Sequence, residues 1–230
     1  GSGTNAQAGT ANTGGGGGGG AGGYQPSPLK LGGAGGSGIV IARAPLSAGV
    51  IFTATNPGGQ QPGSSPNYNE VSQAPNGDIV AKFIASGNLN ILDSGCGASA
   101  DYLIVAGGGG GGGDAGGGGG AGGYRTSFGC GCVSNLNLGT GVYPVTIGAG
   151  GAGGQPQCNT ANPGNDSTFY GISSAGGGGG KVRHSPAPEG SGGSGGGGGY
   201  GGGPVSPQVG GAGNSPPTSP SQGNPGGNQG

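Results

Sequence analysis

Four cysteines are the side chains of this 230-residue chain best suited to covalent cross-linking: Cys96, Cys130, Cys132 and Cys158. Cys130 and Cys132 are separated by a single glycine and are not expected to bond each other. Two disulfides would then join Cys96 and Cys158 to this pair, in one order or the other. Zinc binding needs two well-spaced pairs of ligands, which this spacing does not supply. We therefore expect disulfides in an oxidising compartment, with free thiols as the main alternative.

The glycine tracts imitate ligand-binding loops, but residues that such loops require are missing. Lys181 follows five glycines, yet Ala175 stands where a phosphate loop needs its first glycine and Val182 where it needs Ser or Thr. A GxGxxG match at Gly107–Gly112 leads into no helix. A calcium-binding nonapeptide pattern begins at Gly109–Asp114 and then lacks its large apolar residue. The sequence thus predicts no catalytic, cofactor-binding or metal-binding residue, and no cofactor.

The remaining polar and aromatic residues carry weaker signals. His184 is the one histidine, and no nucleophile and carboxylate are spaced to form a triad with it, so a solvated loop residue is expected. Asn165–Ser167 fits the N-glycosylation acceptor pattern, which makes Asn165 a possible glycosylation site. Tyr24, Tyr124 and Tyr200 lie beside polyglycine, where they would pack over it or contact sugars. The chain is expected not to be an enzyme.

Composition points to backbone-driven packing. The chain has 73 glycines, 6% charged residues and a net charge of −1, so it lacks the self-repulsion that keeps disordered chains expanded. Its scattered cations form no nucleic-acid footprint, and no apolar run approaches the roughly 20 residues of a membrane span. Position 1 carries neither an initiator Met nor a signal peptide. We expect a secreted protein that has lost its leader, or a segment of a longer one.

Short segments rich in β-branched residues between the glycine tracts predict strands, and no helical apolar period is found. Asn56–Pro75 is predicted to be a loop, and Pro204–Gly230 a flexible or polyproline II-like tail. The predicted strands are Gly38–Arg43, Val50–Ala54, Asp78–Ala85, Asn88–Leu92, Asp101–Ala106, Val133–Leu138 and Val142–Ile147.

The glycine tracts admit two structural interpretations once collagen is excluded by the absence of a Gly-X-Y period. They are either flexible linkers or a packed bundle of polyglycine II helices, which have three residues per turn and no internal hydrogen bonds. The string GGGGGAGGY occurs at Gly16–Tyr24 and Gly116–Tyr124, and Ala usually interrupts the runs first, as suits a bundle edge. We expect packing: a mostly irregular and β fold, with short strands flanking the bundle and essentially no α-helix.

The stretch Asp101–Thr126, DYLIVAGGGGGGGDAGGGGGAGGYRT, resembles the glycine-rich domains of phage tail-fibre proteins and related environmental surface proteins. The likeness continues through YPVTIGAGGAGG at Tyr143–Gly154, the polar stretch Asn165–Phe169 and the polyglycine run Gly176–Gly180. It covers roughly residues 78–203. The resemblance implies polyglycine II bundles and receptor-binding loops.

In that family a strand such as GSGIVI closes the domain, but here Gly36–Arg43 stands near the start. The predicted organisation is therefore a closing-type glycine-rich segment (1–45), a strand plus a Pro/Gly/Ser loop or connector (46–77), a glycine-rich domain (78–203), and a Pro/Gly-rich tail or connector (204–230). Residues 1–45 would complete the bundle of a neighbouring copy or fold back onto their own. The first arrangement is a head-to-tail contact, which propagates into a filament unless it closes into a ring.

Two functions follow as expectations. The first is a structural, self-assembling subunit or repeat of an extracellular fibre. The second is a phage tail-fibre or cell-surface adhesin that binds a host receptor through loops such as Asn56–Pro75 and Lys181–Ser194 on a polyglycine scaffold. The expected location is outside the cell or on a virion surface. The expected partners are other copies of the chain and a cell-surface glycan or receptor, with no nucleic acid and no membrane span.

Overall fold

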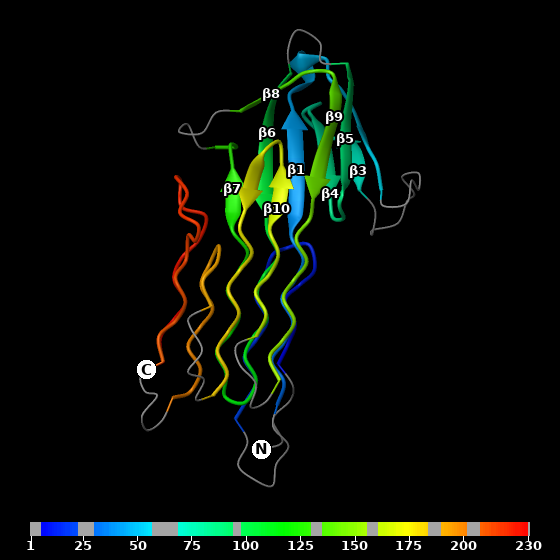
Figure 1. Ribbon diagram of the computed structural model, residues 1–230. Coiled ribbons are helices and arrows are strands. Elements are labelled where there is room, and N and C mark those ends of the chain that lie inside the picture. Colours follow the sequence, from blue (N-terminus) through cyan, green and yellow to red (C-terminus); the bar gives the residue numbers. More distant parts are fainter. Residues whose placement is uncertain are drawn as a thin grey trace.

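A computed structural model describes residues 6–22, 30–56, 69–93, 98–129, 135–155, 161–183, 190–201 and 208–229. The molecule has a strand-rich head, and long segments without strand assignment run side by side away from one end of it (Figure 1). We call these segments the glycine bundle. The bundle segments continue directly from the head strands, so each segment runs in the same direction as the strand that it continues.

The head consists of two antiparallel sheets. The first sheet has the order β3-β4-β1-β6-β7, with β8 also pairing with β6, and the second has the order β11-β10-β9-β5-β2. A 3-10 turn, η1 (Leu46–Ala48), is the one helical element that the described residues contain. The strands are β1 (Ile39–Ala44), β2 (Ile51–Ala54), β3 (Glu70–Gln73), β4 (Ile79–Phe83), β5 (Gly87–Asp93), β6 (Ala98–Val105), β7 (Tyr124–Thr126), β8 (Leu136–Leu138), β9 (Gly141–Thr146), β10 (Ser167–Phe169) and β11 (Ile172–Ser174).

The two sheets share one hydrophobic core because their strands alternate between buried and outward-facing residues. In β1, Val40, Ala42 and Ala44 are buried, and in β5 Leu89 and Ile91 are. Residues with a period of two lie on one face of a strand, so each sheet turns an apolar face inward. The largest fully buried apolar side chains, each worth about 1.5–3 kcal/mol of burial, are Phe83, Phe169, Leu89, Ile91, Ile104 and Leu138.

Most predicted strands are confirmed, and the mainly β character with no α-helix holds for the described residues. Of Val133–Leu138, the structure describes residues 135–138, and the strand occupies Leu136–Leu138. The prediction of a loop over Asn56–Pro75 is wrong at Glu70–Gln73, which forms β3; residues 57–68 lie outside the described part. All four β3 residues are exposed, so this edge strand depends on backbone pairing with β4 and leaves no apolar pattern in the sequence.

The central bundle segment, residues 106–113, is buried along its whole length. Its N–H groups donate in turn to three neighbours, and each neighbour is met again three residues later. The donor–acceptor distances are 2.8–3.1 Å. In order, the bonds run from Ala106 to Gly123, Gly107 to Asn165, Gly108 to Gly36, Gly109 to Gly120, Gly110 to Asn162, Gly111 to Gly33 and Gly112 to Gly117.

The carbonyl groups of the same segment accept bonds from three further neighbours, again at every third residue. These donors lie in residues 17–20, 151–154 and 177–180. Their numbers rise along the central segment, so they run parallel to it, whereas the acceptors of its N–H groups run antiparallel. Six segments therefore surround residues 106–113, which satisfies backbone groups that would be costly to bury unpaired.

Segments from both ends of the chain belong to this bundle. The N–H groups of Gly32, Gly35 and Gly38 donate to carbonyls of residues 148–154, and β1 lies between β4 and β6 in the first sheet. The described part of residues 1–45 thus packs within its own chain, so closure of this bundle and sheet needs no second copy. Residues 208–213 and 222–229, within the predicted tail, bond to residues 192–198 and to each other.

Candidate functional site

The structure describes only some of the residues singled out in the sequence. All four cysteines, together with His184 and Tyr24, lie outside the described residues, so the disulfide prediction is not examined by this structure. Asn165 is exposed, and its backbone N–H donates to the carbonyl of Ala149 at 2.9 Å. Asp114 is buried at a turn with φ of 48°, and its Oδ1 has no hydrogen-bond partner within the described part of the chain.

Two regions have a geometry suited to binding: the glycine bundle and a hollow on the head. In the bundle, exposure follows a period of three. Gly148, Gly151 and Gly154 are buried, whereas the intervening Ala149 and Ala152 are exposed. Every third residue of this segment is thus buried, so alanine occupies the outward side and glycine the contacts. Ala34, Ala121 and Ala212 are exposed in the same way.

Glycine is required at the inner positions by close backbone approach. A Cβ on Gly111 would overlap the carbonyl oxygen of Gly18, and one on Gly110 would overlap that of Ala152. In contrast, a Cβ on Gly118 would have one neighbour, the Gly17 oxygen, at an ordinary contact distance of 3.6 Å. Whether the bundle tolerates a side chain therefore differs from one residue to the next.

Some backbone N–H groups of the bundle have no hydrogen-bond acceptor in the described part of the chain. No described residue accepts a hydrogen bond from the N–H groups of Ala115, Gly118 or Ala121, which recur at every third residue. In residues 222–229, Gly227 and Asn228 are exposed, and a Cβ on Gly227 would meet nothing within 4 Å. Such edges resemble the unpaired edge of a sheet, which can accept a further chain.

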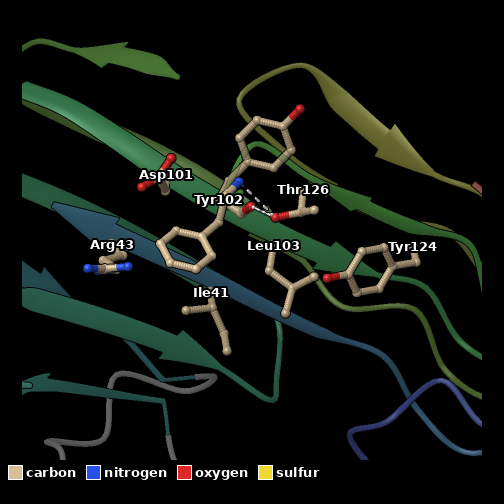
Figure 2. Close-up of a pocket in the computed structure, with 8 residues that line it drawn as sticks. Ile41, Arg43, Asp101, Tyr102, Leu103, Tyr124 and Thr126 are labelled. Carbon is tan, nitrogen blue, oxygen red and sulfur yellow. Dashed lines mark hydrogen bonds between the residues drawn. The ribbon is translucent and has the colours of Figure 1, made fainter. Parts of the chain in front are cut away.

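The second region is an aromatic hollow of about 260 Å³ on the outer face of the first sheet. It forms because β1, β6 and β7 pair in register, with Ile41 opposite Leu103 and Leu103 opposite Thr126. Figure 2 shows Tyr124 at one end and Arg43 with Asp101 at the other. The lining residues are Ile41, Arg43, Asp101, Tyr102, Leu103, Tyr124, Thr126 and Phe128.

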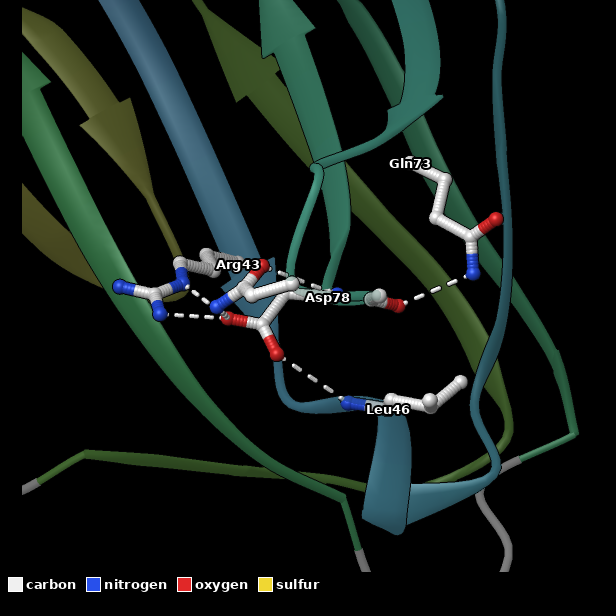
Figure 3. Close-up of polar contacts among 6 residues, drawn as sticks. Arg43, Leu46, Gln73 and Asp78 are labelled. Atoms are coloured by element: carbon white, nitrogen blue, oxygen red, sulfur yellow. Dashed lines mark hydrogen bonds and ion pairs between the residues drawn. The ribbon is translucent and has the colours of Figure 1, made fainter.

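An ion pair fixes one end of the hollow. Arg43 donates from Nε to Oδ2 of Asp78 at 2.7 Å, and its Nη2 contacts the same oxygen. The Leu46 N–H donates to Oδ1 of Asp78 at 3.3 Å, as Figure 3 shows. The hydrogen bond from Arg43, supported by one from Asn76, lowers the pKa of Asp78. The Arg43 guanidinium carbon also lies 4.6 Å from the ring centre of Phe128, a cation–π contact.

This arrangement is suited to binding an apolar group or a ring. Ile41 and Leu103 supply aliphatic surface, and Tyr124 and Phe128 are exposed aromatic rings. The sequence analysis missed the hollow because only strand register brings these residues together. The sequence indicated only that Ile41 and Arg43, two residues apart in a predicted strand, lie on the same face of that strand. Within the described ranges, no three His, Cys, Asp or Glu residues are grouped so as to hold a metal ion, and no helix has the length and apolarity to cross a membrane.

Buried strands that lead into hydrogen-bonded glycine segments define a glycine-rich structural class. A family model described as a glycine-rich domain matches residues 84–230, more than half of the chain, and the chain belongs to this family. The match takes in β5 to β11 and the bundle segments after residue 106, whereas β1 to β4 precede it. Searches of curated proteins and of solved structures gave no match.

Proposed function

We propose that this chain is a structural, self-assembling subunit or repeat of an extracellular fibre, and that its glycine segments are polyglycine II helices. The observation that supports this best is the recurrence of hydrogen bonds at every third residue between residues 106–113 and six neighbours. Polyglycine II has three residues per turn and no internal hydrogen bonds, so each helix needs partners on several sides. A glycine linker would have no reason to exclude side chains from its inner positions alone.

Self-assembly is supported by what the bundle leaves exposed. The backbone N–H groups of Ala115, Gly118 and Ala121 have no acceptor among the described residues, and the chain has little charge with which to repel a second copy. A contact between two different surfaces of the same protein is head-to-tail, and it adds copies without limit unless the rotation closes. The partner in this proposal is the chain itself, and the location is outside the cell, where its predicted disulfides would persist.

Adhesion is the second candidate function, as in a tail-fibre or cell-surface protein. The aromatic hollow favours it, because exposed rings such as Tyr124 and Phe128 beside the fixed polar groups of Arg43 and Asp101 suit a sugar ring of a surface glycan. Binding residues on a rigid scaffold are typical of receptor-binding proteins. In this alternative the glycine bundle serves as the spacer, and no enzyme activity is involved.

Electron microscopy of the purified chain, with sedimentation velocity over a rising concentration series, tests the proposal. Long uniform filaments, or a ladder of oligomers that grows with concentration, are expected. A monomer at every concentration would refute self-assembly. Binding of that monomer to cells or to a glycan array would then support adhesion.

A further inference from the structure

The last two segments of the chain form a hairpin that is held together by hydrogen bonds of its own. In residues 208–229, the N–H groups of Gly226 and Gln229 donate to two carbonyls of the facing segment at 2.8 and 2.9 Å. Asn214 closes the turn, because its Oδ1 accepts from the N–H of Gln222 at 3.2 Å. We call residues 208–229 the terminal hairpin. Since these bonds lie within the hairpin, it can dock as one unit.

The terminal hairpin lies at the border of the bundle (red in Figure 1) and is attached mainly to one segment, residues 190–198. We call this segment the receiving segment. Gly195 and Gly198 each donate to a hairpin carbonyl at 2.9 Å, and Gly211 of the hairpin donates to the carbonyl of Gly196 at 2.8 Å. These are backbone groups, so the receiving segment of a second copy offers the hairpin the same bonds.

Gln222 anchors the terminal hairpin to the head at two points. Its side chain is 2% exposed, and its Oε1 accepts from the N–H of Ala175 at 2.8 Å. Its backbone carbonyl accepts from the N–H of Tyr124 at 2.9 Å. Ala175 follows β11 and Tyr124 begins β7, which are edge strands of the two sheets. A hairpin that docks on another copy therefore meets a specific anchor as well as a glycine surface.

We propose that copies of this chain join by exchanging the terminal hairpin, which docks on the receiving segment of the next copy in place of its own. This inference rests on the proposed self-assembly and names its contact. The occupant is identified by the fold, because the hairpin already fills the receiving segment within one chain. Six residues, 202–207, connect Gly201 to the hairpin, and at about 3.3–3.6 Å per residue they can reach roughly 20 Å.

Exchange in one direction accounts for fibre growth. Each copy gives its terminal hairpin to one neighbour and receives a hairpin from another. The hairpin and the receiving segment are different surfaces, so the contact is heterologous and extends into a filament unless it closes into a ring. The same bonds form within one copy and between copies, so a rising protein concentration favours the exchanged arrangement by mass action.

Alanine substitutions block each half of this contact separately. A Cβ on Gly226 would overlap the carbonyl oxygen of Gly196 and lie 2.9 Å from that of Gly195, so Gly226→Ala blocks the hairpin. A Cβ on Gly195 would overlap the carbonyl oxygen of Gly211 and lie 2.9 Å from the nitrogen of Gly226, so Gly195→Ala blocks the receiving segment. The three atoms nearest to this second Cβ all belong to the hairpin, so the head is expected to fold.

Neighbouring glycines supply matched controls. A Cβ on Gly227 would meet nothing within 4 Å, and one on Gly197 would have its nearest neighbour, the nitrogen of Gly118, at 3.4 Å. Gly227→Ala and Gly197→Ala are therefore expected to assemble like the unaltered chain. Each blocking variant alone is expected to need at least roughly tenfold more protein to assemble, which corresponds to about 1.4 kcal/mol lost at the contact.

Mixing the two blocking variants tests exchange directly. Gly195→Ala keeps an intact hairpin and Gly226→Ala keeps an intact receiving segment, so together they are expected to form a one-to-one dimer and nothing longer in sedimentation velocity. Thermal unfolding shows whether each variant is folded. If Gly226→Ala does not fold, Gly211→Ala replaces it, because a Cβ there would overlap the carbonyl oxygen of Gly190.

The outcomes separate this contact from self-assembly as such. A mixture of folded variants that stays monomeric would overturn the exchange. Filaments that form from each blocking variant as from the unaltered chain would also overturn it, and they would leave the proposed self-assembly standing through another surface. A dimer in the mixture, together with an unaltered chain that is monomeric at every concentration, would support docking of the hairpin between copies and refute self-assembly of the natural chain.

Discussion

Gly118 and Gly119, adjacent in one bundle segment, allow a direct test of packing, because an added Cβ has free space at the first and overlaps backbone atoms at the second. Gly119→Ala places a Cβ that overlaps the carbonyl oxygen of Gly109, and lies 2.6 Å from its carbonyl carbon and 2.7 Å from the oxygen of Gly110. These are backbone atoms that no rotamer change can move aside. Gly118→Ala places its Cβ 3.6 Å from the oxygen of Gly17, an ordinary contact.

The expected effects on stability differ in sign. To admit a Cβ at residue 119, the segments 106–113 and 116–123 must separate, which costs about 1–3 kcal/mol of overpacking. Separation also weakens hydrogen bonds such as Gly109 to Gly120, each worth about 0.5–1.5 kcal/mol net. Gly119→Ala should therefore lower the free energy of unfolding by about 2–4 kcal/mol. Gly118→Ala should raise it by about 0.4–1 kcal/mol, because alanine restricts the unfolded chain.

Thermal and denaturant unfolding of the two variants, followed by circular dichroism and calorimetry, measures the difference. For a chain of this length, 1 kcal/mol shifts Tm by about 2–4 °C, so Gly119→Ala should unfold several degrees below the unaltered protein and Gly118→Ala slightly above it. Both variants add one methyl group to the same segment, so composition is controlled. Equal Tm values for the two would refute the packing argument and favour a flexible linker.

Other consequences concern the head and its joints with the bundle. The hydrogen bond from Arg43 lowers the pKa of Asp78 in the folded protein. The ionised carboxylate therefore stabilises the fold above its unfolded pKa of about 3.9, and this stabilisation is lost as the pH falls through the lower folded pKa. Asp78→Asn should flatten the Tm-versus-pH curve below pH ~4. Phe83→Ala should lower the free energy of unfolding by about 3–5 kcal/mol. A single calorimetric transition in this variant would show that the head and the bundle unfold together, whereas two transitions would contradict joint unfolding. Gln222→Leu removes the Oε1 that accepts from the Ala175 N–H at 2.8 Å, which should cost about 1–3 kcal/mol and speed exchange of the Ala175 amide; unchanged exchange would separate residues 222–229 from the folded unit.

The longer strands could be predicted because their signal is local. β1, β5 and β6 contain β-branched or alternating segments that indicate a half-buried strand by themselves. β7, β10 and β11 are three residues long, and polar residues such as Ser167 and Thr168 give them no apolar period. β7 and β10 pair with β6 and β9, which lie about 20 residues earlier in the chain, and a local pattern does not contain that pairing; β11 pairs with the adjacent β10 across a two-residue turn.

The sequence could predict that the glycine segments pack together, but not which segments are neighbours. Composition and the alanine interruptions indicated packed glycine segments, and the exposed alanines agree with that. Identical glycines give no information about which segment is central, so the position of residues 106–113 among six neighbours follows only from the three-dimensional path. Residues 208–229 were predicted to be a tail. Proline and glycine favour an extended backbone both in a hydrogen-bonded segment and in a free one, so composition does not separate the two. The aromatic hollow depends on the register of β1, β6 and β7, so Phe128 and Tyr124 could not be assigned to it from sequence.

Hydrogen exchange at single amides of residues 106–123 tests the central claim most directly. The account predicts slow exchange throughout residues 106–112, whose N–H groups are all bonded. In residues 116–123 it predicts a period of three, with fast exchange at Gly118 and Ala121 and slow exchange at the six residues that donate to neighbouring segments. Uniformly fast exchange across both segments, measured by NMR on the folded chain, would contradict the packed glycine bundle.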